Sequence, residues 1–306
     1  MKVFVTGVNG QLGHDVVNEL IRRNHAPVSS DITPSYAGEK DNSPVTTSAY
    51  IPLDITDKEA VLKTITGIKP DVVIHSAAWT NVDAAEDEAN KDKVFSINTE
   101  GTRNIAEAVK LIDSKMVYIS TDYVFSGLGD KPWLPDSKDF APLNVYGESK
   151  LGGEKAVSEL LAKYFIVRTA WVFGKNGKNF IKTMLNLAKT HDTLRVVDDQ
   201  IGTPTYTYDL SRLLVDMIET EKCGYYHATN EGGYISWADF AKAIFEEAGT
   251  DVKVIPVTTA EYGLSKAKRP FNSRLDKSKL TQNGFTPLPA WRDALKRYLK
   301  EIEAGK

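Results

Sequence analysis

Tyr146 and Lys150 have the residue types and the spacing for proton transfer to a carbonyl group. They stand four residues apart in the run Tyr-Gly-Glu-Ser-Lys, and side chains four apart on a helix share one face. A nearby ammonium favours phenolate, so we expect Lys150 to lower the pKa of Tyr146 from its usual value of about 10. Such a phenol can donate a proton to a carbonyl oxygen. The spacing alone is common by chance, and an exposed tyrosine beside a solvated lysine is its simpler interpretation.

A glycine-rich turn near the start of the chain favours dinucleotide binding. Gly7, Gly10 and Gly13 follow a strand-like run and open a helix, where glycine lets the backbone turn tightly and approach a ligand. The N–H groups and the dipole of such a helix start can hold a pyrophosphate. Asp31 follows Gly13 by 18 residues, and a carboxylate there accepts hydrogen bonds from both ribose hydroxyls and repels a 2′-phosphate. We therefore expect a nicotinamide dinucleotide, with Lys150 also binding the nicotinamide ribose.

Thr121 supplies a third group at the end of a predicted strand. The apolar run 116–120 leads directly into Thr121, which precedes Tyr146 by 25 residues. Ligands of open α/β sheets lie at the carboxyl ends of the strands, so a hydroxyl there can polarise and orient a carbonyl. A strand-end capping residue is the simpler interpretation of Thr121 alone. Taken together, the three signals favour an enzyme that acts on a carbonyl group.

The elements that must position these groups alternate between strand and helix in the first half of the chain. Patterns of apolar residues predict strands at 3–5, 27–30, 50–53, 71–75, 115–120 and 164–168, and helices at 11–23 and 94–112. Thr56 and Glu59 predict a capping box for a further helix, and 31–48 is expected to be an irregular loop. This alternation favours an α/β fold with a Rossmann-type doubly wound parallel sheet, covered by helices on both faces.

The pattern changes after about Trp171. Helices are expected at 179–190, 208–219, 236–249 and 290–303, the third capped by Ser236 and Asp239, with a last sheet strand at 225–228. The remainder lacks a strand–helix–strand rhythm, and we expect a smaller α/β substrate domain interleaved with the first. The predicted division is 1–171 for the dinucleotide-binding domain, to which 205–230 returns, and 172–306 for the substrate domain.

Composition excludes several classes of protein. The 306 residues are 42% apolar, which is too much for a disordered chain, and the net charge of −3 does not suggest non-specific binding to nucleic acid. The single cysteine, Cys223, excludes an internal disulfide and a cysteine zinc cage. No run approaches the ~20 consecutive apolar residues of a membrane span, and the early first strand leaves no room for a signal peptide. We expect a cytoplasmic protein without nucleic-acid or membrane partners, and no metal.

The three signals together resemble the extended short-chain dehydrogenase/reductase superfamily. Five motifs narrow the resemblance to the dTDP-4-dehydrorhamnose reductase family: STDYVFSG at 120–127, PLNVYG at 142–147, RTAWVF at 168–173, DQIGTPT at 199–205 and RP at 269–270. The resemblance covers nearly the whole chain. It implies reduction of the 4-keto group of dTDP-4-dehydro-L-rhamnose, the last step in the synthesis of dTDP-L-rhamnose for cell-wall polysaccharide.

The resemblance also implies roles for individual residues. The implied catalytic residues are Thr121, Tyr146 and Lys150. The implied sugar contacts are Thr121, Asp122, Tyr146 and Trp171. The implied cofactor contacts are Gly10, Gln11, Leu12, Asp31, Asp54, Ile55, Ala78, Trp79, Thr80, Tyr146 and Lys150, to which the glycine turn adds Gly7 and Gly13. Arg269 could neutralise the pyrophosphate of the nucleotide sugar or be a surface arginine, and Trp171 could line the sugar pocket or be a core residue at the domain junction.

Two other functions stay open at this point. Dehydratases of this superfamily have a Glu directly after the Asp that corresponds to Asp122. This chain has Tyr123 there, so dehydration is disfavoured. A 4-epimerase is not excluded. A regulatory subunit of the methionine adenosyltransferase type shares the fold and could bind NADP without catalysis. The cofactor is expected to be NADPH or NADH: Asp31 favours NADH on physical grounds, yet the family also accepts NADPH. Some family members are metal-bridged dimers, so the resemblance allows a homodimer.

Overall fold

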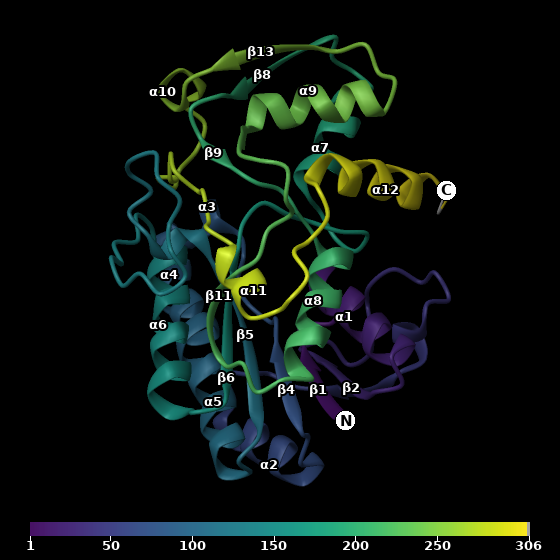
Figure 1. Cartoon of the computed structure of the whole chain (residues 1–306), viewed down its shortest axis with the longest axis vertical. Helices are drawn as coiled ribbons and strands as arrows, with labels where there is room; N and C mark the ends of the chain where they lie inside the picture. Colours follow the sequence, from purple (N-terminus) through teal and green to yellow (C-terminus); the bar gives the residue numbers. More distant parts are fainter. Residues whose placement is uncertain (305–306) are drawn as a thin grey trace.

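Seven parallel strands form one sheet in the computed structural model, which describes residues 1–304 (Figure 1). The strand order is β11-β6-β5-β4-β1-β2-β3, and every neighbouring pair is parallel. The strands are β1 (Lys2–Thr6), β2 (Ala26–Asp31), β3 (Ala49–Pro52), β4 (Val72–His75), β5 (Lys115–Thr121), β6 (Tyr164–Thr169) and β11 (Gly224–His227). The predicted Rossmann-type sheet is confirmed, and the point where its order reverses lies between β1 and β4.

Helices cover both faces of this sheet, as Figure 1 shows. The helices of one face are α1 (Gln11–Arg22) and α8 (Thr207–Ile218), and those of the other are α2 (Lys58–Ile68), α5 (Thr102–Leu111) and α6 (Val145–Leu160). Successive side chains of a strand point to opposite faces. Accordingly, Val3 and Val5 pack with Leu214 in one core, whereas Phe4 packs with Ile105 in the other.

Two local predictions on the α2–α5 side need correction. Asp57, and not Thr56, caps α2: its carboxylate accepts a hydrogen bond from the Ala60 N–H at 3.0 Å. The predicted capping box is wrong because the Thr56 hydroxyl donates to Asp54 instead. The helix expected at 94–112 begins earlier. After the short α3 (Val82–Ala85), α4 (Glu88–Phe95) continues through a π-helical stretch, η2 (Ser96–Gly101), into α5.

A smaller layer lies beyond the carboxyl ends of the sheet strands, at the top of Figure 1. In it, β8 (Thr193–Val197) and β13 (Lys253–Val257) pair in parallel, and α9 (Trp237–Glu247) packs on both. The sequence analysis expected an α/β substrate domain but did not predict these two strands. In β8 only Val196 and Val197 are buried, and β13 is mostly exposed and contains Pro256, which cannot donate a ladder hydrogen bond, so neither has the typical signal of a buried strand. The capping box of Ser236 and Asp239 is confirmed.

The chain crosses between the sheet and this smaller layer several times. Phe173, Phe240 and Tyr298 centre the core of the smaller layer, whereas Leu280 and Phe285 pack in the core beside α1 and α8. The division at residue 171 stays a prediction. The remaining elements are η1 (Pro44–Thr47), η3 (Asp122–Val124), β7 (Val172–Phe173), α7 (Phe180–Leu187), β9 (Ile201–Gly202), β10 (Thr205–Tyr206), β12 (Ile235–Ser236), α10 (Thr259–Tyr262), α11 (Ser278–Gln282) and α12 (Trp291–Ala304).

Candidate active site

Thr121 and Tyr146 come from two elements that meet at the carboxyl end of β5. Thr121 is the last residue of β5, and the turn η3 that follows it packs against α6. Tyr146 lies in the first turn of α6, whose start is fixed by Asn144: its amide oxygen accepts a hydrogen bond at 2.8 Å from the N–H three residues later. The ring of Tyr123 packs edge-on against that of Tyr146, with 5.6 Å between the ring centres. The turn after β5 and the start of α6 thus pack around the half-buried Tyr146 ring.

Burial governs the acidity of that phenol. Burial raises the pKa of Tyr146 above its usual range, a side-chain hydrogen bond with Thr121 opposes the rise, and the charge of Asp122 adds to it. The expected lowering of this pKa is therefore wrong for the protein by itself, because burial outweighs the other influences on the phenol. A phenol that keeps its proton at neutral pH is in the state that a proton donor requires.

Lys150 lies one turn further along α6 and is 3% exposed. Its ammonium nitrogen is 4.1 Å from the centre of the Tyr118 ring. Burial lowers the pKa of Lys150 to about 7, and the charge of Glu154 opposes this fall. Within residues 1–304, the hydrogen bonds of Lys150 outside its helix involve only its backbone. The N–H donors of a buried ammonium are thus left for the hydroxyl groups of a ligand, and a ribose fits this requirement.

Asp122 places a buried carboxylate beside the Thr121 hydroxyl. That hydroxyl donates to Asp122 Oδ1 at 3.0 Å and accepts the Tyr123 N–H at 3.2 Å. Asp122 Oδ2 is buried and has no hydrogen-bond partner in the described part of the chain. Burial raises the pKa of Asp122 to about 6. A buried acceptor without a partner is costly, so this oxygen is suited to a ligand hydroxyl.

The glycine turn between β1 and α1 is tightly packed. Gly7 has a φ of +75°, and a Cβ on it would lie 2.5 Å from the backbone nitrogen of Ala77. A Cβ on Gly13 would collide with the Gly7 carbonyl group. Gly10 caps α1 without any side-chain hydrogen bond, so the first N–H groups of the helix are not satisfied by a cap. These features fit a pyrophosphate at the start of α1.

Gln11 and Leu12 begin α1, and the side chain of each contacts other parts of the protein. Leu12 is buried in the core between α1 and the sheet. The Gln11 amide oxygen accepts a hydrogen bond at 3.0 Å from Asn179, the capping residue of α7. With their side chains engaged, Gln11 and Leu12 have their backbone N–H groups left for a ligand bound at the glycine turn.

Asp31 is the last residue of β2, as the sequence predicted. Its Oδ2 accepts the N–H of Asn9 in the glycine turn at 2.9 Å, and its Oδ1 accepts the Ile32 N–H at 2.8 Å. The carboxylate is therefore fixed beside the turn. Asp54 and Ile55 follow β3: the Asp54 carboxylate accepts two hydrogen bonds from the residue two positions later, and the Ile55 side chain is buried.

The segment 78–80 after β4 is held by a residue that the sequence analysis missed. Asn98, in the π-helical stretch η2, accepts the Trp79 N–H at 2.8 Å and donates to the Trp79 carbonyl at 3.1 Å. It also donates to the Ser149 hydroxyl at 2.9 Å, directly before Lys150. Asn98 thus connects this segment to the helix that carries Tyr146. The poor helix formers in SINTEG, at 96–101, are the signal that could have indicated it.

Trp171 and Arg269 are both engaged by neighbours. The Trp171 indole stacks on Trp237 with 3.7 Å between the ring centres. Arg269 donates to both carboxylate oxygens of Asp83, at 3.1 and 2.7 Å. Its charge still reaches the site, because it lowers the pKa of Tyr123 against the larger rise that burial causes. A bidentate contact of Arg269 with a pyrophosphate would therefore compete with Asp83.

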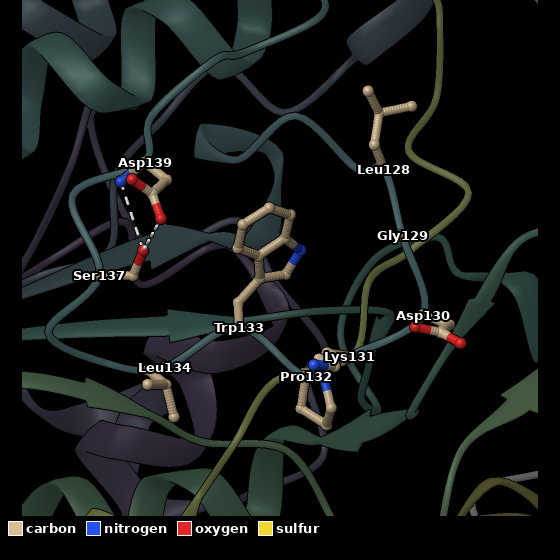
Figure 2. A pocket seen from close by; sticks show the side chains of 9 residues that line it. All are labelled: Leu128, Gly129, Asp130, Lys131, Pro132, Trp133, Leu134, Ser137 and Asp139. Carbon is tan, nitrogen blue, oxygen red and sulfur yellow. Dashed lines mark hydrogen bonds between the residues drawn. The ribbon is translucent and has the colours of Figure 1, made fainter.

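A separate cavity of about 330 Å³ lies in the loop after β5 (Figure 2). It is lined by residues 128–134, Ser137 and Asp139. One of its lining residues, Trp133, stacks on Phe125 with 4.7 Å between the ring centres. None of the predicted site residues lines this cavity, so it is distinct from the place where Thr121 and Tyr146 meet.

Residues 1–304 contain neither a cluster of metal-ligating side chains nor a membrane-spanning helix. No group of three His, Cys, Asp or Glu side chains gathers there as a metal site. No helix of that part is long and apolar enough to cross a bilayer.

Relatives by sequence extend over the whole chain. A family model described as RmlD substrate binding domain matches residues 1–304. A dTDP-4-dehydrorhamnose reductase of Shigella flexneri is 37% identical over 313 residues, covering 99% of this chain and 98% of the relative. The spore coat polysaccharide biosynthesis protein SpsK of Bacillus subtilis is 38% identical over 300 residues, covering 98% and 97% of the two chains.

A solved structure agrees with these relatives. The crystal structure of dTDP-4-dehydrorhamnose reductase from Bacillus anthracis, in complex with NADP, superposes with a TM-score of 0.88 and 41% identity. The match covers 98% of this chain and 99% of that one. With the Rossmann-type sheet and the meeting of Thr121 and Tyr146 at its strand ends, the chain belongs to the dTDP-4-dehydrorhamnose reductase family.

Proposed function

We propose that this protein reduces the 4-keto group of dTDP-4-dehydro-L-rhamnose with NAD(P)H, the last step of dTDP-L-rhamnose synthesis. Family membership supports an NAD(P)H-dependent reductase. Several relatives that match almost the whole chain are named dTDP-4-dehydrorhamnose reductase. The observation that supports the proposal is the Tyr146 phenol beside the Thr121 hydroxyl at the carboxyl end of β5, with Lys150 one turn further along the same helix.

NADH or NADPH supplies the hydride when it is bound. We assign its pyrophosphate to the N–H groups at the start of α1, around Gly10, and its adenosine ribose to Asp31. The nicotinamide ribose is assigned to Lys150, and the dinucleotide backbone runs past segment 78–80. Asp54 and Ile55 are assigned to the adenine. Because the Asp31 carboxylate repels a 2′-phosphate, we propose that NADH is preferred.

Tyr146 donates its phenolic proton to the ketone oxygen, which becomes the 4-hydroxyl group of the product. Its raised pKa keeps the proton in place until negative charge develops on that oxygen. The Thr121 hydroxyl turns its proton from Asp122 Oδ1 to the ketone oxygen, where it orients the carbonyl and stabilises the developing charge. The Lys150 ammonium then stabilises the phenolate that remains.

The other predicted contacts hold the nucleotide sugar. Asp122 Oδ2 accepts a hydrogen bond from a sugar hydroxyl, which satisfies an acceptor that has no protein partner. Trp171 forms one wall of the sugar pocket. Arg269 exchanges its bond to Asp83 for a contact with the pyrophosphate of the nucleotide sugar.

The division at residue 171, a homodimer and a cytoplasmic location complete the proposal. Limited proteolysis tests the division, light scattering tests the dimer, and fractionation of the cells that express the chain tests the location.

The reaction is tested by following the oxidation of NADH and of NADPH with dTDP-4-dehydro-L-rhamnose and with other nucleotide 4-ketosugars. The proposal expects net oxidation and formation of dTDP-L-rhamnose. An altered sugar configuration without net oxidation would instead identify an epimerase. Cofactor binding without turnover of any ketosugar would favour a regulatory subunit.

A further inference from the structure

A buried ion pair lies directly behind the proposed reacting residues. Arg168 of β6 and Glu154 of α6 each expose only 1% of their side chains. Arg168 Nε and Nη2 each donate to one carboxylate oxygen of Glu154, both at 2.7 Å. Arg168 Nη1 donates to the Pro135 carbonyl at 3.0 Å, and the guanidinium packs on the Phe125 ring at 4.9 Å. The pair is therefore satisfied and rigid.

Glu154 and Arg168 each lie close in the structure to a residue that carries or adjoins a proposed reacting side chain. Glu154 follows Lys150 by four residues and lies on the same face of α6. Arg168 is the register partner of Ser120 across the β5–β6 ladder, and the Ser120 hydroxyl donates to Glu154 Oε1 at 2.6 Å. Ser120 directly precedes Thr121. The carboxylate of Glu154 thus connects the strand that carries Thr121 to the helix that carries Lys150.

Stability alone gives little reason for an ion pair at this place. Burying two charges carries a large desolvation cost, and apolar residues of similar volume often replace a buried pair without loss of stability. A fixed pair is useful where geometry and local charge must be controlled.

We propose that the Glu154–Arg168 pair is a positioning device: through Ser120 it holds Thr121 in place, and its carboxylate keeps Lys150 charged. Neither partner is assigned a contact with substrate or cofactor. The inference rests on the proposed function for the roles of Thr121 and Lys150.

Lys150 depends on Glu154 because its other neighbours offer no negative charge at neutral pH. The titratable groups near the ammonium within residues 1–304 are Tyr118 of β5, His75 of β4, and Tyr146 and Glu154 of its own helix. Burial raises the pKa of Tyr146, so its phenol is neutral. Burial raises the pKa of Tyr118 and lowers the pKa of His75 to about 3, so both are neutral. Since Glu154 opposes the fall in the pKa of Lys150, removing its charge lowers that pKa further.

The main test replaces both partners, Glu154→Gln with Arg168→Met, so that no unpaired charge is buried. NADH affinity is measured by fluorescence across the neutral pH range. In the wild type, affinity falls as the pH rises and Lys150 loses its proton. We expect the midpoint of this fall to move down by up to about one pH unit in the double variant, because Glu154 is the charge that acts on Lys150 and the loss of the Arg168 charge offsets its removal only in part. A folded double variant with an unmoved midpoint overturns the proposal.

A matched control removes a second bidentate pair. Arg297 of α12 donates to both oxygens of Asp209 in α8, at 2.9 and 2.7 Å, and neither residue contacts the proposed site. Asp209→Asn with Arg297→Met should lower stability and leave the midpoint in place, and an equal shift in this control overturns the proposal. NADH binding can be measured without turnover. A protein that fails to reduce the ketosugar would contradict the proposed function, but the pH midpoint of NADH binding would still test the positioning role.

Ser120→Ala tests the connection to Thr121 and leaves both charges in place. We expect kcat for the ketosugar to fall by about tenfold, as for a small misplacement of a reacting group, with the pH midpoint of NADH binding unchanged. This variant decides the proposal if the double variant does not fold. A wild-type kcat in Ser120→Ala would overturn it.

Discussion

The ammonium nitrogen of Lys150 lies 4.1 Å from the centre of the Tyr118 ring, and the Tyr118 hydroxyl donates to the Lys150 carbonyl at 3.2 Å. One buried tyrosine thus contacts the lysine at both its backbone and its side chain. The face of an aromatic ring attracts a cation without occupying its N–H donors. Lys150 is therefore held in position while its donors remain available to a ligand.

Replacement of the proposed proton donor tests the role of Tyr146. Tyr146→Phe keeps the ring that packs against Tyr123 and removes only the hydroxyl. We expect kcat for ketosugar reduction to fall at least ~100-fold, the usual range for loss of a general acid, and NADH affinity to change far less. Oxidation of NADH in stopped-flow and steady-state assays measures both. Tyr164→Phe, at the opposite end of the sheet, is the control, and equal rates for Tyr146→Phe and the wild type would refute the role.

Asp31 is expected to set the choice between the two nicotinamide cofactors. Asp31→Asn keeps an oxygen that can accept the Asn9 N–H and removes the negative charge that opposes a 2′-phosphate. We expect the ratio of kcat/KM for NADH to that for NADPH to fall by about fivefold or more, mainly through better use of NADPH. The ratio is its own control, because a general loss of activity leaves it constant. An unchanged ratio would show that the carboxylate does not discriminate.

The alternating strands and helices and the glycine turn were enough to predict the sheet. Their signals are local: short β-branched runs, apolar residues at helical spacing, and glycines at a strand–helix junction. The strands β8 and β13 were missed because β8 buries only Val196 and Val197, and because Pro256 within β13 argues against a strand.

The errors at the site have a different origin. Asn98 and the Glu154–Arg168 pair act through contacts between residues far apart in the sequence, which no local pattern reveals. The direction of the Tyr146 pKa was wrong because four-residue spacing to Lys150 says nothing of burial, and burial exceeds the other influences on that phenol.

A buried acid between α1 and α8 predicts that stability depends on pH. Asp15 accepts a hydrogen bond from the Thr207 hydroxyl, and burial raises the pKa of Asp15 from 3.8 to about 7. The folded state therefore binds this proton between these two values and the unfolded state does not. The resulting stability is full below pH 3.8 and is lost as the pH rises through about 7.

Asp15→Asn should remove this dependence. From about pH 5 to about pH 8, we expect the wild type to lose about 2 to 3 kcal/mol of unfolding free energy relative to the variant. Urea unfolding of both proteins at the two pH values measures the difference, in which the other titrating groups cancel. Glu59→Gln removes an exposed carboxylate and should follow the wild type. Parallel pH curves for Asp15→Asn and the wild type would contradict the prediction.

Two glycines within helices should respond in opposite ways to a methyl group. Gly153, in α6, packs where a Cβ would collide with the Tyr118 hydroxyl and lie 2.8 Å from the Asn98 carbonyl oxygen. We expect Gly153→Ala to lower the free energy of unfolding by about 1 to 3 kcal/mol. It should also lower kcat, since a shift of α6 moves Tyr146 and Lys150.

Gly67, in α2, is the matched control, because a Cβ there meets nothing within 4 Å. Gly67→Ala should raise the free energy of unfolding by about 0.5 kcal/mol through the lower backbone entropy of alanine in the unfolded chain, and it should leave kcat unchanged. Urea unfolding and NADH oxidation measure both variants. If Gly153→Ala were as stable and as active as Gly67→Ala, close packing of α6 on Tyr118 would not be what positions the helix.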